Sequence, residues 1–138
     1  EYAMKDGLAL YGYNKSEDTF VSGALAKGRL WESRSSREFC EGLQELGARA
    51  DFLDVGANIG TWTLPLARCL QAAGRGGRVF AVEGMPPIAE YMEASLVRNN
   101  LTDVVEVYEY AVGDGLALAE GAASEAPGRV AMSLDPTN

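Results

Sequence analysis

The sequence predicts an α/β fold, in which a doubly wound and mostly parallel sheet alternates with helices. An apolar run at 52–53 passes through a glycine-rich turn into an amphipathic helix, and strand-like runs follow at 78–82 and 104–112 with a helical segment between them. This alternation is typical of β-α-β units. The 138 residues are enough for one domain with one core.

The chain is expected to divide into a lead-in segment, residues 1–34, and a ligand-binding domain, residues 35–138. The lead-in contains turn-forming residues at Gly12 and at 14–16. It precedes the first segment with clear helical periodicity, and that segment begins the predicted domain.

The first helix is expected from about Ser36 to Leu46. Ser35 and Glu38 have the spacing of a capping box, and Gly47 can end the helix. One face carries an apolar stripe that is predicted to face the core. The stripe consists of Phe39, Leu43 and Leu46.

The second helix follows the glycine-rich turn. Pro65 is compatible with a helix only in its first turn, so the helix should start near Thr61 or Trp62. Gly74 lies just beyond the last apolar residue of the pattern and is expected to end it.

A third helix is predicted from about Pro87 to Asn99, with a proline at its first turn. The strand at 104–112 follows it. Residues 115–128 are rich in Ala, Gly and Glu without periodicity, which predicts an irregular connection or a frayed hairpin. A short strand is expected within 129–134.

The turn at 54–62 is the most informative part of the chain for function. Gly56 and Gly60 lack a Cβ, which allows a tight turn and close approach of a ligand. A dinucleotide fingerprint starting at Gly56 would need glycine at Asn58 and at Thr61, and neither is present. No Gly-Lys-Ser/Thr sequence closes a P-loop either. The pattern favours a nucleotide-like ligand without a diphosphate.

Two acidic residues favour a cationic nucleoside ligand. Asp54 precedes the turn, where a carboxylate repels pyrophosphate and attracts an ammonium or sulfonium group. Glu83 ends the next strand-like run, at the position where a carboxylate accepts ribose hydroxyls in this layout. S-adenosylmethionine satisfies both requirements, and residues Tyr110 and Ala111 would flank its adenine.

Four stretches resemble, in order and spacing, the FkbM family of S-adenosylmethionine-dependent methyltransferases. They are FLDVGANIG at 52–60, VFAVE at 79–83, NNL at 99–101 and YAVGD at 110–114. The resemblance implies a Rossmann-like class I methyltransferase fold and O-methylation of a hydroxyl on a small molecule or sugar. The expected cofactor-binding residues are Asp54, Gly56, Ala57, Asn58, Gly60, Thr61, Glu83, Gly84, Met85 and Ala111.

The chain departs from the family pattern in two places. The family has an aromatic residue and then a proline beside the ribose-binding acid, whereas Gly84 and Met85 follow Glu83 here. Met85 is expected to cover the adenine. The chain also stops at Asn138, before the fourth strand of the family, so it is expected to contain only the N-terminal half of the fold. The strand at 52–55 would then have an open edge.

Composition excludes several function classes. A net charge of −8 disfavours a nucleic-acid partner, and the absence of histidine excludes His-based triads and the commonest zinc sites, so no metal is expected. Cys40 and Cys69 lie among apolar neighbours in predicted helices and are expected to be buried thiols. No apolar run is long enough to cross a membrane, so a soluble, cytoplasmic domain is the default expectation.

Three functions remain open from the residues alone. The first is an S-adenosylmethionine-dependent O-methyltransferase or its cofactor half, in which the protein mainly positions two reactants. The second is a nicotinamide dinucleotide oxidoreductase. The third is a non-catalytic domain that keeps the fold. No general base is identified; Glu32, beside Trp31, is a candidate polar residue near the methionine end of the ligand.

Overall fold

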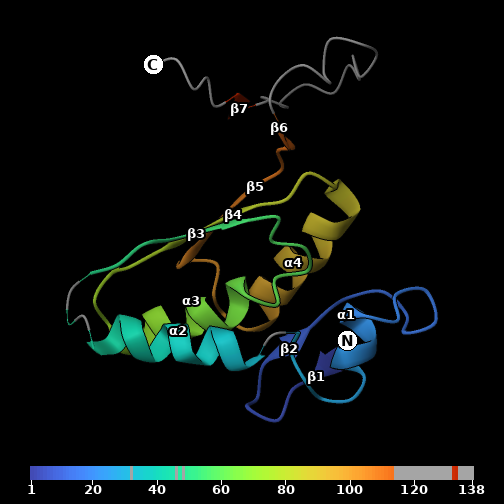
Figure 1. Ribbon diagram of the computed structural model, residues 1–138, viewed down its shortest axis with the longest axis horizontal. Helices are drawn as coiled ribbons and strands as arrows, with labels where there is room; N and C mark the ends of the chain where they lie inside the picture. Colours follow the sequence, from blue (N-terminus) through green and yellow to red (C-terminus); the bar gives the residue numbers. More distant parts are fainter. Residues whose placement is uncertain (32, 46, 48, 114–131, 134–138) are drawn as a thin grey trace.

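The computed structural model describes residues 1–31, 33–45, 47, 49–113 and 132–133. Figure 1 shows the order of its elements. The helices are α1 (Val21–Leu25), α2 (Ser33–Glu45), α3 (Thr63–Ala73) and α4 (Pro86–Arg98). The strands are β1 (Tyr2–Ala3), β2 (Ala9–Leu10), β3 (Phe52–Val55), β4 (Val79–Val82), β5 (Val105–Tyr108), β6 (Val112–Gly113) and β7 (Met132–Ser133).

A parallel sheet in the order β3-β4-β5 forms the centre of the fold. α3 packs against β4 and α4 against β5, with α2 beside α3, and Figure 1 shows the three helices on one side of the strands. Leu53 and Val55 point to the other side and are exposed. The predicted α/β class and the β-α-β order are therefore confirmed.

Within the described ranges, β3 pairs only with β4 and leaves its other edge open, as the sequence predicted. The third strand is shorter than the predicted 104–112. β5 ends at Tyr108, and Val112 pairs separately with Met132 of β7, inside the short strand expected at 129–134. The irregular connection predicted at 115–128 lies outside the described residues.

Part of the lead-in belongs to the same hydrophobic core as the helices and the sheet. Leu8, Leu10 and Leu25 are almost completely buried in that core. Asn99, at the end of α4, fixes β2: its side chain accepts a hydrogen bond from the Ala9 amide at 3.0 Å and donates one to the Ala9 carbonyl at 2.6 Å. Two-residue strands give too little periodicity to be recognised in the sequence.

The predicted helices exist, but their boundaries differ. α2 begins at Ser33, so Ser35 lies inside the helix and the predicted capping box is wrong. Phe39 was expected to face the core, but it is 45% exposed. α3 begins one or two residues later than predicted and ends at Gly74, whose φ of 63° is left-handed, as a C-terminal glycine requires.

A disulfide joins Cys40 of α2 to Cys69 of α3. The expectation of two free thiols is therefore wrong. Each cysteine lies in a predicted helix among apolar neighbours, and the 29-residue separation gives no indication that the helices lie side by side. Only the packing of α2 on α3 brings the two sulfurs together.

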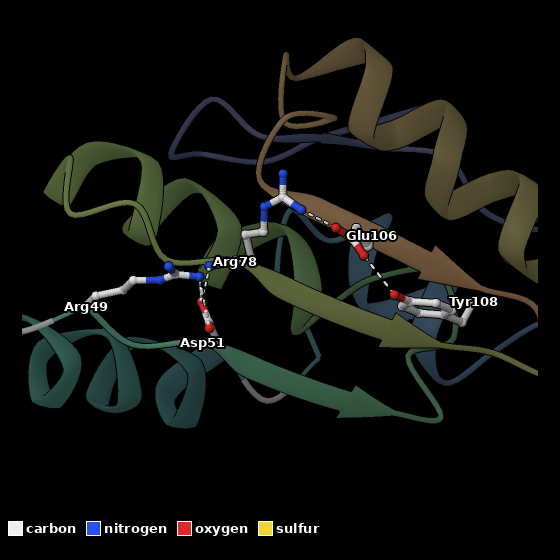
Figure 2. A network of polar contacts seen from close by, with 5 residues as sticks. All are labelled: Arg49, Asp51, Arg78, Glu106 and Tyr108. Atoms are coloured by element: carbon white, nitrogen blue, oxygen red, sulfur yellow. Dashed lines mark hydrogen bonds and ion pairs between the residues drawn. The ribbon is translucent and has the colours of Figure 1, made fainter. Parts of the chain in front are cut away.

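Polar contacts fix the strand register near the amino ends of the strands (Figure 2). The Arg78 amide donates to Asp51 Oδ1 at 2.9 Å, and the Asp51 carboxylate also pairs with Arg49. The Arg78 guanidinium pairs with Glu106 of β5, which accepts a hydrogen bond from the Tyr108 hydroxyl. These exposed pairs contribute little stability individually, but they connect all three strands.

Breaking the disulfide should destabilise the protein. Closure of a loop of this length contributes about 3–4 kcal/mol in the chain-entropy model. We therefore expect the Cys40→Ala, Cys69→Ala double variant to lose about this much unfolding free energy in urea. The unmodified protein in excess dithiol should show the same loss. Equal stability of all three samples would mean that the bond does not form in solution.

Candidate functional site

The glycine-rich turn lies between the carboxyl end of β3 and the start of α3. Gly56, Asn58 and Gly60 have left-handed φ values of 78°, 53° and 85°. A Cβ on Gly60 would lie 2.4 Å from a Leu64 methyl carbon, and its φ of 85° is one that other residues rarely adopt, so both packing and backbone conformation favour glycine here. A Cβ on Gly56 would meet nothing within 4 Å, which leaves open space beside its backbone. Side chains of the core thus pack against the turn at Gly60, whereas the space beside the Gly56 backbone is open.

β4 holds this turn in place. The carbonyl of Val82 accepts hydrogen bonds from the amides of Gly56, at 2.8 Å, and Ala57, at 3.0 Å. The turn therefore keeps a fixed position relative to the end of β4, where Glu83 follows directly. These two amides are engaged by the protein itself.

Glu83 is a buried carboxylate that connects two loops. Its Oε2 accepts a hydrogen bond from the Asn58 amide at 2.9 Å, and its Oε1 accepts one from the Met85 amide, also at 2.9 Å. Each carboxylate oxygen has a second lone pair, so both can still accept a hydroxyl. The predicted role of Glu83 as a hydroxyl acceptor is compatible with this geometry.

Gly84 has a steric reason to follow Glu83. A Cβ at this position would lie 3.1 Å from the Ala111 Cα and 3.3 Å from the Tyr110 carbonyl oxygen. The loops after β4 and β5 therefore touch here, and a larger residue would push them apart. Met85, by contrast, is 57% exposed and contacts neither cavity described below.

Asp54, on the helix side of β3, is held by the first residue of α3. The Thr63 hydroxyl donates to Asp54 Oδ2 at 2.6 Å. Burial raises the pKa of the Asp54 carboxyl, the Thr63 hydrogen bonds oppose that rise, and the charge of Glu83 adds to it. Asp54 thus contacts the first residue of α3.

Two cavities adjoin at the turn. The larger, about 540 Å³, has Asp54 and Thr61 in its wall, and the smaller, about 260 Å³, has Glu83. They share Val55 and Gly56. Gly56, Ala57 and Asn58 also line the larger cavity, whereas Gly84 and Ala111 line the smaller.

The structure thus brings together eight of the ten predicted site residues, with Asp54 and Glu83 on opposite sides of the turn. Gly60 and Met85 line neither cavity, because Gly60 packs against Leu64 and Met85 is exposed. Glu32 falls outside the described residues.

An aromatic wall of the larger cavity was not predicted as part of the site. The Phe39 ring meets the Phe52 ring edge-on at a centroid distance of 5.2 Å, and Phe52 stacks on Trp62 at 6.5 Å. Trp31 also lines the cavity. Phe39 belongs to the helix stripe that was expected to face the core. It does make apolar contacts, but it makes them in the wall of the cavity.

The described part of the chain contains no group of three or more Cys, Asp or Glu side chains placed to hold a metal ion. None of its helices is long and apolar enough to cross a membrane.

Comparison with known proteins identifies methyltransferases as similar. No family model matches the chain. The chain is 44% identical to protein-L-isoaspartate O-methyltransferase of Aeropyrum pernix over 63 residues. The aligned stretch covers 46% of this chain and 22% of that protein. The chain therefore spans less than a quarter of this curated relative.

Two solved structures share the fold. Cofactor-bound Rv0187 from MTB matches with a TM-score of 0.50 and 26% identity, over 80% of this chain and 49% of that one. The O-methyltransferase from Bacillus cereus in complex with SAH matches with a TM-score of 0.50 and 25% identity, over 72% and 45%. The fold is thus that of the Rossmann-like methyltransferases, and the chain covers about half of each neighbour.

Replacing Asp54 should stabilise the ligand-free protein. Because the folded state raises the pKa of Asp54, the folded protein binds this proton more tightly than the unfolded chain, and the stability contributed falls as pH rises through the folded pKa. Asp54→Asn should therefore be more stable than the unmodified protein at pH 7, measured by urea unfolding. The difference should disappear at acidic pH, below the ordinary pKa of aspartate.

Asp103→Asn is the matched control, because it removes the same charge from an exposed position just before β5. Lower stability of Asp54→Asn at pH 7 would show that the Thr63 hydrogen bonds outweigh the cost of burial.

Proposed function

We propose that this chain is the cofactor-binding part of an S-adenosylmethionine-dependent methyltransferase. The observation that carries the proposal is the placement of Asp54 and Glu83 in two adjoining cavities on either side of one open glycine turn. The SAH bound in the similar Bacillus cereus enzyme supports the same ligand class here. Residues 35–138 are proposed as the binding domain and residues 1–34 as the lead-in that adds Val21 and Trp31 to the larger cavity.

The proposed binding mode assigns one end of the ligand to each cavity. Glu83 accepts the ribose hydroxyls, with Gly84 and Ala111 beside the adenine, in the smaller cavity. Asp54 attracts the ammonium group of the methionine end in the larger one. Asn58 connects the two cavities. Its backbone amide donates a hydrogen bond to Glu83, and Asn58 also lines the larger cavity.

Bound S-adenosylmethionine would supply an electrophilic methyl group, which an acceptor nucleophile takes by in-line displacement. The residues of this chain bind and orient the reactants, and such positioning lowers the barrier through proximity. No general base is assigned.

The proposed acceptor is a hydroxyl on a small molecule or sugar, as in the FkbM-like family that the four sequence stretches resemble. The names of the Aeropyrum pernix and Bacillus cereus enzymes, both O-methyltransferases, support oxygen as the acceptor atom. The net charge of −8 argues against a nucleic-acid acceptor.

Ligand-dependent stabilisation tests the proposal. S-adenosylhomocysteine at about one hundred times its Kd should add roughly 2.7 kcal/mol to the stability of the folded state. For a domain of this size the Tm should rise by about 10 °C. NADH at the same concentration should leave the Tm unchanged. A rise with NADH instead would support the oxidoreductase, and no rise with either ligand would support a non-catalytic domain.

The role of Glu83 can be tested separately. Glu83→Ala should weaken S-adenosylhomocysteine binding by about 1–3 kcal/mol, because hydrogen bonds to a charged acceptor are lost. Isothermal titration calorimetry measures the change. Glu93→Ala is the control, since it removes the same charge from an exposed position of α4. Equal affinity of Glu83→Ala and the unmodified protein would remove Glu83 from the site.

A further inference from the structure

Thr63 is completely buried at the start of α3, and its contacts with Asp54 connect the helix to the larger cavity. Its hydroxyl donates to Asp54 Oδ2 at 2.6 Å. This hydroxyl is the group that a substitution can remove while the size of the side chain is kept.

The surroundings of Asp54 make this contact consequential. Phe52 and Trp62 lie in the wall of the same cavity, and a carboxylate beside such apolar groups is less favourable in its charged form. The negative charge of Glu83 acts in the same direction, whereas the Thr63 hydrogen bonds oppose both effects. Thr63 therefore favours the ionised carboxylate and restricts its orientation.

We propose that Thr63 is a positioning residue, which holds the Asp54 carboxylate for the ammonium group of a ligand's amino-acid end in the larger cavity. The inference rests on the proposed function. It assigns Thr63 to one end of the ligand only, because the proposed binding mode places the nucleoside end in the smaller cavity, which Glu83 lines. A purely structural role would affect both ends alike.

Two ligands that differ only at the amino-acid end test the proposal. S-adenosylhomocysteine carries the ammonium group, and 5′-methylthioadenosine has the same nucleoside and sulfur without it. In Thr63→Val the Kd of S-adenosylhomocysteine should rise about tenfold, as expected for loss of a hydrogen bond to a charged group. The Kd of 5′-methylthioadenosine should not change. Thr63→Ser keeps the hydroxyl and should bind both ligands normally.

A pH series gives a second measurement. Binding of S-adenosylhomocysteine should weaken as Asp54 becomes protonated at low pH. Without the Thr63 hydroxyl the pKa of Asp54 should rise, so Thr63→Val should lose binding at a higher pH than the unmodified protein. In an Asp54→Asn background, Thr63→Val should have no further effect on the Kd.

Each remaining outcome contradicts a specific claim. If Thr63→Val weakens both ligands equally, or leaves both unchanged, Thr63 does not position Asp54 for the ammonium group, although the proposed cofactor site stands. If the unmodified protein binds neither ligand, the proposed function fails and the inference fails with it. If Thr63→Val does not fold, Thr63→Ala replaces it in the same measurement. Equal weakening of both ligands in Thr63→Ala, or unchanged binding of both, would contradict the proposal.

Discussion

The structure of the site depends on the buried carboxylate of Glu83. It accepts the amide of Asn58 with one oxygen and the amide of Met85 with the other, so the loops after β3 and β4 are fixed to each other. The paired amides of Gly56 and Ala57 on the Val82 carbonyl strengthen the same connection. An unpaired carboxylate is costly to bury, and the hydrogen bonds from the Asn58 and Met85 amides explain why this one is tolerated.

The two acidic residues of the site differ in how their charge is supported. Glu83 is held by backbone amides of two neighbouring loops, whereas Asp54 is held by Thr63 of a single helix, and burial raises its pKa. A charge that is incompletely compensated in the folded protein gains most from a cationic ligand. This difference is the reason why the proposed binding mode assigns the ammonium group to Asp54 and the neutral hydroxyls to Glu83.

The helices place the site at the carboxyl ends of the parallel strands, where ligands bind in open α/β sheets. The Cys40–Cys69 disulfide fastens α2 to α3, and α2 in turn brings Phe39 to the larger cavity. The polar contacts of Figure 2 fix the opposite end of the strands. The turn is therefore held between a rigid sheet and a covalently linked helix pair.

The sequence by itself determined the fold class, the positions of three helices, the glycine turn, and Asp54 and Glu83 as acidic residues next to it. These features depend on local periodicity, on backbone conformation and on strand ends, which neighbouring residues encode. Only the tertiary structure decided the disulfide, the exposure of Phe39, the contact of Gly84 with Ala111 and the hold of Thr63 on Asp54. Each of these features depends on how segments that are separate in the chain pack together. No local pattern specifies which separated segments come into contact.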